Sequence, residues 1–381
     1  MEVKQVYTLA NTATQEVLGA TAVLNEDLSN LVDIGTEIFN ANAVDRYVRS
    51  LVNQIGRIVF VNRPYRGSVP SVLMDGWEFG SVLEKIQGEL PTATVNETWE
   101  LVDGASYDPN IFYQPKVSAK FFNSKVTFEV DCSFTERQVK QSFQNGTQLN
   151  AFLSMLYANV EKAMTIRIDA FVMRTINHMT AATIHDGVSS RAINLLALYN
   201  ARYPQANLTA ATAMTTPEFI RFASYTMANY MDRLEKISNL FNMGGKSRFT
   251  PKDLLHVVML SDFRNAADIY LQSDTFHDAY TKLPNAETVP YWQGSGEDYS
   301  FEEISKIHVN TAGNDEVVQS GILCVMFDRD ALGVMNPDRR VTTNYNAKAE
   351  FWTNFYKWDS SYFNDYNENF IVFYVDDEGE I

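Results

Sequence analysis

The chain has 381 residues, of which 45% are hydrophobic and 20% are charged. This composition excludes a collagen, a disordered chain and a disulfide miniprotein, and a length above ~250–300 residues favours two or more lobes over one core. Its 31 basic and 47 acidic side chains give a formal net charge of −16, which disfavours sequence-independent binding to nucleic-acid phosphates. The sequence contains no apolar run of about 20 residues, so no transmembrane helix is predicted.

The N-terminal part of the chain predicts an arm followed by helices. Residues 1–24 are polar with weak periodicity, which predicts an extended arm without the charged and apolar regions of a secretory signal. Two apolar stripes at helical spacing then reach Ile55, the first interrupted at Gly35 and the second preceded by Asn42 as N-cap.

Residues 63–116 are punctuated by glycine and proline and predict a long, loosely packed hairpin. Polar and apolar residues alternate over 94–101, as in a strand with one exposed face. A hairpin of this length is too long for an ordinary connection between two elements. It has few core residues and therefore needs a partner surface to be stable. Aromatic residues make up 13% of the chain and are enriched at protein interfaces, so self-association is favoured over chemistry.

Strands are predicted over 117–122 and 125–132, and a long helix follows. Apolar residues recur at steps of three to five from Leu149 to Met179, which predicts one unbroken helix of about 30 residues. A coiled coil is the disfavoured alternative, because aromatic and Met positions break a heptad.

The second half of the chain predicts an α/β lobe. Thr216 and Pro217 begin a helix whose apolar stripe reaches Phe241 and ends at Gly244–Gly245. The remaining predictions are a buried strand at 254–260, a helix from Ser261, a loop at 284–300, and strands at 304–309, 321–327 and 370–375. The two cysteines, Cys132 and Cys324, lie far apart in apolar runs and are expected to be buried thiols.

The search for chemistry yields no catalytic residue, cofactor or metal site. Gly245-Lys246-Ser247 resembles the end of a phosphate loop but lacks the glycine five positions earlier, so it is interpreted as part of a helix C-cap. His256 lies in an apolar strand and is expected to be a core histidine. Asp262 follows a buried strand, where enzymes place nucleophiles, but a helix N-cap is its more ordinary role.

The segment 321–334, which contains Phe-Asp-Arg-Asp-Ala-Leu-Gly, resembles a strand and motif of tailed-bacteriophage major capsid proteins. Residues 342–373 are similar to the closing segment of that family. The resemblance implies an α+β fold of the Hong Kong ninety-seven phage type. Its expected parts are an N-terminal arm and helices at 1–62, an extended loop at 63–116, a peripheral domain at 117–187 and 336–375 with a spine helix at about 147–179, an axial α/β domain at 188–335, and an acidic tail at 376–381.

The resemblance implies a structural protein whose hexamers and pentamers close an icosahedral shell around double-stranded DNA, which it encloses without specific binding. The resemblance also implies that the protein is part of the virion, that the capsid is assembled in the host bacterial cytoplasm, and that the protein does not bind a membrane. Further expected partners are a portal, a separate scaffold protein or maturation protease, and a decoration protein. Open alternatives are an encapsulin-like nanocompartment, a tail tube or portal, and an α/β hydrolase centred on Asp262.

On this reading the functional residues are subunit contacts: Trp77, Trp99, Lys85, Arg339 and Arg340. Lys85 lies where the family's type member has a cross-linking lysine, but no motif supports a cross-link, and none is expected. Arg339–Arg340 is too small a basic cluster to indicate nucleic-acid binding. Deleting residues 70–110 is expected to leave soluble protein that cannot form shells. The acidic excess is expected to lie partly on the lumenal face.

Overall fold

The structure is a computed structural model. The residues that it describes are 3–19, 23–25, 29–40, 43–51, 69–74, 83–88, 90–91, 93, 99–107, 110, 112, 114, 116–142, 146–272, 286–292, 305–311 and 315–377. They belong to two compact units, each built from separate stretches of the chain: unit 1 comprises Met1–Glu78, Lys125–Met173 and Val334–Ser361, and unit 2 comprises Phe79–Ser124, Arg174–Gly333 and Tyr362–Ile381.

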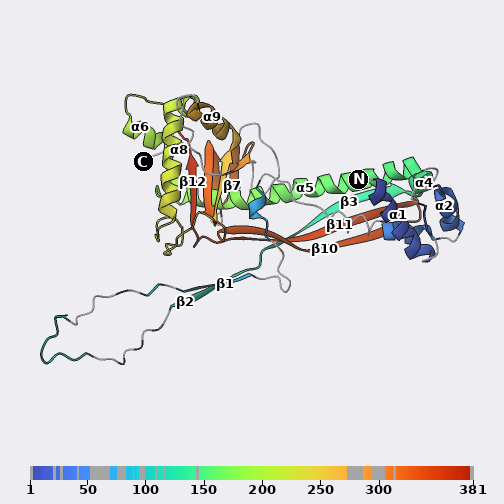
Figure 1. The fold of residues 1–381 in the computed structure, drawn as a ribbon, viewed down its shortest axis with the longest axis horizontal. Helices are drawn as coiled ribbons and strands as arrows, with labels where there is room; N and C mark the ends of the chain where they lie inside the picture. The colour runs from blue at the N-terminus through green and yellow to red at the C-terminus, as the bar shows by residue number, and fades with distance from the viewer. Residues whose placement is uncertain are drawn as a thin grey trace. The chain divides into compact units, whose positions relative to one another are not determined.

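Unit 1 is a three-stranded sheet covered by helices (Figure 1). Its elements are α1 (Val3–Leu18), α2 (Leu31–Asn40), a helical stretch at 44–51, a 3-10 turn at Pro70–Val72, β3 (Lys125–Thr135), α4 (Glu136–Ser142) and most of α5 (Gly146–His185), β10 (Leu332–Asn346) and β11 (Phe351–Asn364). The strand order is β10-β11-β3, and β11 pairs antiparallel with β3.

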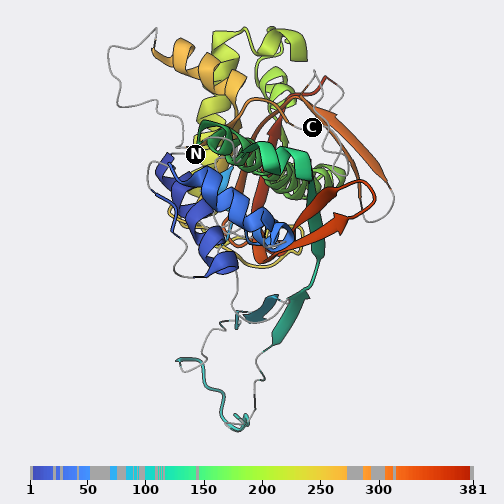
Figure 2. The ribbon, with the colours of Figure 1, turned by 90° about the vertical axis from the view of Figure 1, so that its right-hand side faces the viewer.

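The core of unit 1 forms where alternating residues of β11 meet the helices. Trp352 and Trp358 lie opposite Phe134 and Phe128 in the register of β11 with β3, so these rings share one face. Both tryptophans are buried with residues of α1, α5 and the helical stretch at 44–51. Figure 2 shows the blue helices of the N-terminal region packed together in this unit.

Unit 2 contains a five-stranded sheet in the order β4-β12-β9-β5-β6. Its strands are β4 (Ala192–Asn194), β5 (Leu255–Leu260), β6 (Glu287–Val289), β9 (Ile322–Asp328) and β12 (Phe370–Tyr374). The central strand β9 pairs antiparallel with both β5 and β12 and is buried along its whole length, as expected for an apolar run between two neighbours.

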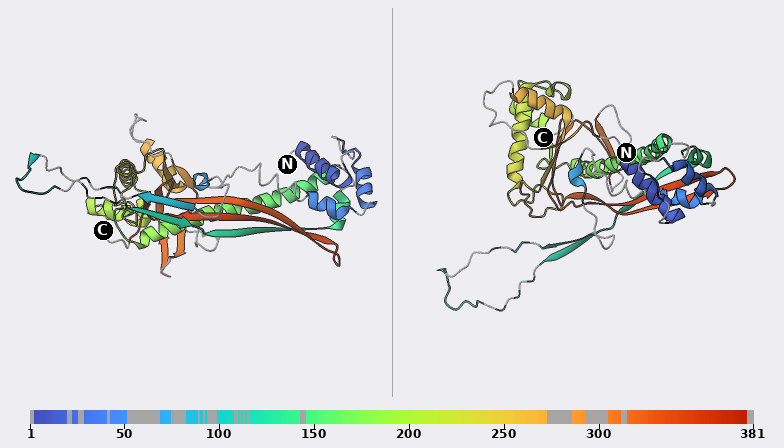
Figure 3. Two further views of the ribbon diagram at one scale, coloured as in Figure 1. Left: turned by 90° about the horizontal axis from the view of Figure 1, so that it is seen from below. Right: turned by 45° about the vertical axis from the view of Figure 1, so that its right-hand side comes forward.

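Unit 2 also contains helices, a hairpin and a separate pair of strands (Figure 1). They are α6 (Leu195–Arg202), α7 (Ala210–Ala213), α8 (Pro217–Leu234), α9 (Ser261–Gln272), the hairpin of β7 (Lys306–Asn310) and β8 (Glu316–Ser320), and the antiparallel pair β1 (Leu83–Gly88) and β2 (Val117–Phe122). Figure 3 shows that β1 and β2 form a separate two-stranded ribbon, here called the ribbon.

Several predicted elements are confirmed. The long helix is present as α5, which continues six residues beyond Met179 to His185. The strands at 117–122 and after Lys125, the buried strand before Ser261 and the final strand are also present, as β2, β3, β5 and β12. None of the helices in the described ranges is long and apolar enough to cross a membrane.

The prediction of an extended arm at residues 1–24 is wrong, because Val3–Leu18 forms α1. Ala10, Ala13 and Val17 recur at helical spacing and are buried in unit 1. Thr14 is also buried, and its hydroxyl donates to the Ala10 carbonyl. Alanine and threonine add little to an apolar stripe, so the periodicity of this helix is weak in the sequence. In addition, α2 runs through Gly35 without interruption.

The helix after Thr216 is shorter than predicted. It ends at Leu234 rather than near Phe241, because the following segment turns back on itself. Ser238 forms an antiparallel bridge with Arg248, and the Thr250 amide donates to the Leu234 carbonyl. Gly244–Gly245 therefore lies within a loop and is not a helix C-cap.

Smaller differences concern strands. The predicted loop at 284–300 contains β6, and β8 was not predicted. Residues 99–101 are not in a strand, and residues 94–98 of that predicted strand lie outside the described residues.

Candidate functional site

The residues considered as catalytic candidates lie in structural positions. His256 is half-buried on β5, and its ring stacks on Phe327 at 5.6 Å between centroids. Burial holds the pKa of His256 below its ordinary value, so the ring is an uncharged part of the packing, as predicted. Asp262 is exposed in the first turn of α9, where a carboxylate complements the helix dipole. Cys324 is buried, whereas Cys132 is only partly buried, and both are free thiols.

In the part of the chain that the structure describes, no group of three or more His, Cys, Asp or Glu side chains is placed to hold a metal ion. Among the described residues, a cluster of charged side chains instead lies in unit 2, where the ribbon meets the segment 365–369 that precedes β12. We call this the ribbon-base cluster.

The two faces of the ribbon differ in chemistry. In its antiparallel register Lys85 lies opposite Lys120, and Gln87 lies opposite Ser118, so these four residues share one face. Phe122 on the same face packs against Phe363, with 5.4 Å between ring centroids. We call this the inner face, because Gln87 is buried and both lysines are partly buried.

The opposite face of the ribbon, here called the outer face, holds exposed apolar side chains, with Glu84 placed opposite Phe121 at one end. It carries Ile86, Val117 and Phe121, which are 68%, 62% and 63% exposed. A sheet ordinarily buries its apolar face and leaves its charged face in water. The ribbon has the reverse arrangement within the single chain.

The ribbon-base cluster is formed around two acidic side chains, Asp365 and Glu368. The Lys85 ammonium lies 3.0 Å from Asp365 Oδ2 and 3.1 Å from Glu368 Oε1, and Lys120 donates to the other Asp365 oxygen at 3.0 Å. Gln87 donates to Asp365 Oδ2 at 3.1 Å and accepts from Asn367 at 2.9 Å. These bonds fix the ribbon to the segment 365–369 through charge-assisted hydrogen bonds.

Burial and neighbouring cations act differently on the two carboxylates. Burial alone would raise the pKa of Asp365, but the Lys85 and Lys120 ammonium groups outweigh it and hold that pKa below its ordinary value. Burial raises the pKa of Glu368 above its ordinary value, although Lys85 and Arg248 oppose the shift. Asp365 is therefore the firmly ionised anchor of the cluster.

The loop that contains Gly244 packs closely against the same segment. The Gly244 amide donates to the Tyr366 carbonyl at 2.8 Å, and the Phe370 amide donates to the Phe241 carbonyl at 2.9 Å. A Cβ atom at position 244 would overlap the Asn367 side chain, so glycine is required there for close approach rather than for helix termination.

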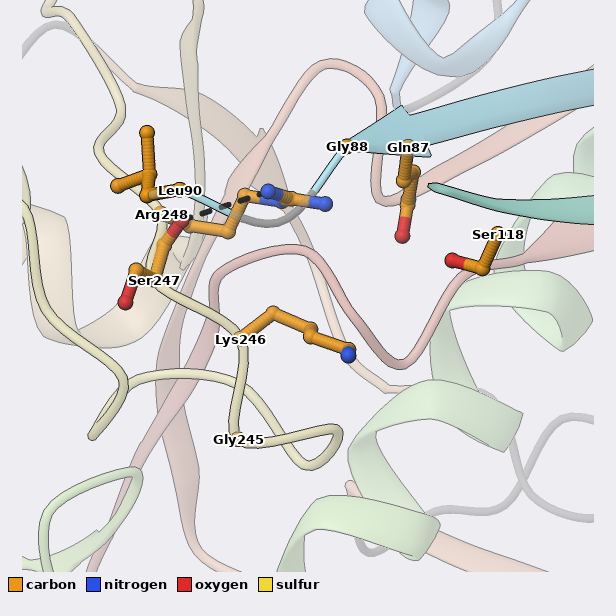
Figure 4. A pocket seen from close by; sticks show the side chains of 8 residues that line it. All are labelled: Gln87, Gly88, Leu90, Ser118, Gly245, Lys246, Ser247 and Arg248. Carbon is orange, nitrogen blue, oxygen red and sulfur yellow. Dashed lines mark hydrogen bonds between the residues drawn. The ribbon is translucent and has the colours of Figure 1, made fainter. Parts of the chain in front are cut away.

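A cavity of about 270 Å³ opens between the ribbon and this loop (Figure 4). The described residues that line it come from two segments: Gln87, Gly88, Leu90 and Ser118 from the ribbon and its continuation, and Gly245, Lys246, Ser247 and Arg248 from the loop. Arg248 also lies against the acidic pair, with Nε 3.2 Å from Glu368 Oε2. We call this space the ribbon-base cavity.

The predicted contact residues are not gathered at one place. Lys85 is in the ribbon-base cluster and only 18% exposed, whereas Trp99 is 96% exposed in the connection between β1 and β2. Arg340, in unit 1, pairs with Asp359 at 3.0 Å. Trp77 lies outside the described residues, as does the side chain of Arg339.

Asp365, Glu368 and Arg248 were not singled out by charge or spacing, since nothing in their own segments matches a known site motif. The only sequence signal was indirect: Asp365 and the run Asn367-Glu368-Asn369 belong to the closing segment that resembles the capsid family. Their meeting with Lys85 depends on tertiary contacts about 280 residues apart.

The fold is shared with chains from solved phage structures. One is in the capsid structure of Staphylococcus phage Andhra, with a TM-score of 0.54, 12% sequence identity, and coverage of 82% of this chain and 85% of that chain. Another is in the structure of the head fiber and inner core protein gp22 of native bacteriophage P68, with a TM-score of 0.52, 10% identity, and coverage of 81% of this chain and 84% of that chain. Among curated proteins, none matches this sequence.

These similarities define a mixed helix-and-sheet protein with a fold of the phage capsid class. The family follows from the sequence itself, because the family model for Phi29-like phage major capsid protein matches residues 8–374. The chain belongs to that family. It is accordingly a structural protein of the capsid shell and a component of the virion, and it is not an enzyme.

Proposed function

We propose that copies of this chain assemble as hexamers and pentamers into an icosahedral shell around double-stranded DNA, with the extended loop at 63–116 resting on a neighbouring copy. The observation that carries this proposal is the exposed apolar outer face of the ribbon, with Ile86, Val117 and Phe121. Two-stranded ribbons are marginally stable alone, and apolar patches of this kind mark protein–protein contacts.

The inner face explains why the ribbon itself persists in the single chain. Lys85 and Lys120 bind Asp365, so the base of the ribbon is anchored by charge while its apolar face remains outside. Beyond the base, Trp99 and Phe112 are 96% and 83% exposed. Burying these side chains against a neighbour would contribute to assembly at ~25 cal/mol per Å² of apolar surface.

The proposed architecture is the Hong Kong ninety-seven phage type, with α5 as the spine helix. The proposed parts are a helical N-terminal region at 1–62, the extended loop at 63–116, the peripheral domain at 117–187 and 336–375, the axial domain at 188–335 and the acidic tail at 376–381. The length of α5 supports a spine helix, and the five-stranded sheet of unit 2 supports a separate axial domain. Because β12 (Phe370–Tyr374) belongs to that sheet, this strand is better counted with the axial domain than with the peripheral domain.

The proposed partners are other copies of the chain, a portal, a separate scaffold protein or maturation protease, and a decoration protein. Assembly would take place in the host cytoplasm. The net charge of −16 supports a shell that encloses DNA without binding it tightly, because an acidic surface repels phosphates.

The test removes the distal loop but keeps the ribbon. Residues 90–115 are replaced by a short Asn-Gly turn, which leaves β1, β2 and the bonds of Lys85 and Lys120 in place. Light scattering after size exclusion and negative-stain images then compare this variant with the full chain, both expressed with whatever scaffold the full chain requires. The expected result is a folded variant that forms no shells. Normal shells would overturn the role of the loop.

The contents of the shells separate this function from that of a protein-filled nanocompartment. Shells from infected cells should contain double-stranded DNA. Shells that contain no nuclease-resistant DNA and hold a protein cargo instead would favour the nanocompartment.

A further inference from the structure

An open groove lined by aromatic side chains lies between α6 and α8 in unit 2, where the two helices pack together (Figure 1). Its volume is about 780 Å³, and its aromatic lining consists of Tyr199, Tyr203, Phe222 and Tyr225. Tyr199 is buried, and its ring centroid lies 4.9 Å from that of Tyr203 and 5.4 Å from that of Phe222. Tyr203 and Tyr225 are 45% and 61% exposed, so the groove presents apolar surface to solvent. We call it the aromatic groove.

The charged side chains of the aromatic groove are two arginines, Arg202 and Arg221, and one acid, Glu218. The Arg202 guanidinium lies over the Tyr203 ring, 5.7 Å from its centroid. Arg202 is exposed and forms no ion pair within the described part of the chain, whereas Arg221 already interacts with another group. Arg202 is therefore the cation of this groove that is available to a further carboxylate.

The residues that follow β12 are attached to the same part of unit 2. The side chain of Asn194, the N-cap of α6, donates to the Asp376 carbonyl at 2.9 Å. The Asp377 carboxylate accepts from the Ala210 amide at the start of α7 at 2.7 Å. These bonds determine where the next residues, 378–381, leave the described part of the chain.

The aromatic groove is within reach of those next residues. Ala206 lines the groove and precedes Ala210 by four positions, so the two Cα atoms are at most ~14 Å apart. Residues 378–381 extend up to ~14 Å beyond Asp377, which is bonded to Ala210. These four residues lie outside the described ranges, and their sequence is Glu-Gly-Glu-Ile. The segment thus provides two carboxylates and one branched apolar side chain.

We propose that residues 378–381 bind in the aromatic groove of their own chain, with a glutamate of this segment paired to Arg202. A guanidinium can bind a carboxylate through two parallel hydrogen bonds, so the charges of the segment and of Arg202 are complementary. Ile381 provides apolar surface to cover the exposed rings of Tyr203 and Tyr225.

Two features favour this occupant over others. A segment joined by a few residues to its site has an effective concentration of about millimolar, which a separate copy in dilute solution does not reach. Aromatic and arginine side chains also bind single-stranded nucleic acid, but the chain has a net charge of −16 and Asp376 and Asp377 lie at the start of the segment.

This inference goes beyond the proposed function, because it does not depend on shell formation. The segment would act as a cover that closes an exposed aromatic surface of unit 2 to other proteins. A carboxylate rather than the groove alone would hold the cover in place, since Arg202 lies at the exposed side of Tyr203.

The first test measures how fast tetranitromethane nitrates each tyrosine of the unassembled chain, by peptide mass spectrometry. The full chain is compared with a variant that stops at Asp377. Removing residues 378–381 should make Tyr203 and Tyr225 react about threefold faster, whereas Tyr107, 48% exposed between β1 and β2, should react at the same rate in both. Thermal unfolding checks that the shortened chain folds. Equal rates at Tyr203 and Tyr225 in the two chains would overturn the proposal.

The second test concerns the ion pair and is read at Tyr225, which lies on the other helix from Arg202. Arg202→Gln in the full chain should expose Tyr225 to nitration as the truncation does, and so should Glu378→Gln combined with Glu380→Gln. The matched control is Arg233→Gln, because Arg233 also lies over a tyrosine, Tyr230, at 4.8 Å but does not line the groove. Equal nitration of Tyr225 in Arg202→Gln and Arg233→Gln would overturn the role of Arg202.

These measurements also identify any other occupant. Protection within a single chain does not change with protein concentration. Protection that increases with concentration, or that is found only in shells, would assign the groove to a neighbouring copy and overturn the proposal. Protection that is lost after nuclease treatment would assign the groove to nucleic acid and would also overturn it. Neither outcome bears on whether the chain forms shells, so the proposed function is tested separately.

Discussion

Lys85 donates a hydrogen bond to Asp365 across 280 positions of sequence, with 3.0 Å between Nζ and Oδ2. The Asp365 side chain is completely buried, and the Lys85 side chain is partly buried. This pair connects the ribbon to the segment before β12, within unit 2.

Replacing Lys85 by Met should destabilise unit 2 by about 3 kcal/mol, because it leaves buried Asp365 with Lys120 as its remaining cation. Urea unfolding measures the change. The control is Lys252→Met, which breaks an exposed ion pair with Asp232 and should change the unfolding midpoint little. Equal effects of the two replacements would show that the Lys85 pair is no anchor.

Asp365 and Glu368 should change the free energy of unfolding in opposite directions as the pH rises, because their pKa values are shifted in opposite directions. The pKa of Glu368 is raised, so its contribution falls as the pH rises from the ordinary value of 4.5 through the folded pKa. The pKa of Asp365 is lowered, so its contribution is present above 3.8 and is lost as the pH falls through the folded pKa.

Glu368→Gln should therefore flatten the stability profile between pH 4.5 and neutrality, while Asp365→Asn should reduce the loss of stability at acid pH. Urea unfolding at a series of pH values provides both profiles. An unchanged slope above pH 4.5 in Glu368→Gln would contradict the raised pKa.

Gly244→Ala should destabilise unit 2 by about 2 kcal/mol, because the added methyl group would overlap Asn367 and push the loop away from the ribbon-base cluster. Gly88→Ala is the matched control, since a Cβ there meets no atom within 4 Å. Thermal unfolding compares the two variants. A stable Gly244→Ala protein would mean that the loop adjusts without cost.

Trp99→Ala should leave unfolding of the unassembled chain unchanged, because its side chain is 96% exposed. Assembly should be impaired, since the ring is predicted to be buried against a neighbour. Trp99→Phe, which keeps an aromatic ring, should restore much of the assembly. Light scattering measures it, and full assembly of Trp99→Ala would remove this residue from the contact.

Arg340, in unit 1, is another residue that is predicted to contact a neighbouring subunit. Its guanidinium pairs with Asp359, and this hydrogen bond holds the pKa of Asp359 below its ordinary value. Arg340→Met should impair shell formation, because Arg340 is also proposed to contact a neighbour, whereas Asp359→Asn alters only interactions within the chain. Identical assembly defects in both variants would mean that Arg340 acts within its own subunit.

The long helix and the buried strands could be predicted, because the spacing of apolar residues within each segment determines these elements. Apolar residues from Leu149 to Met179 repeat at helical spacing, and α5 covers them. The apolar run at 255–260 became a buried strand between two neighbours. In contrast, α1 was missed because its buried positions include Ala10, Ala13 and Thr14, whose burial comes from packing rather than from hydrophobic pattern.

The residues of the ribbon-base cluster could not be predicted from local sequence pattern. Lys85 stood out only through the family resemblance, and nothing in its own segment indicated Asp365 or Glu368 as partners. The end of α8 at Leu234 was set by the bridge between Ser238 and Arg248, which pairs segments after the helix and brings Arg248 to the cavity.

The sequence by itself determined the acidic composition, the long helix, the buried strands and the membership of a capsid family, because each depends on composition or on residues close in the chain. Tertiary structure alone decided which face of the ribbon is charged and buried and which is apolar and exposed. That choice depends on Lys85 and Lys120 meeting Asp365, and a contact between distant segments leaves no periodic trace in the sequence.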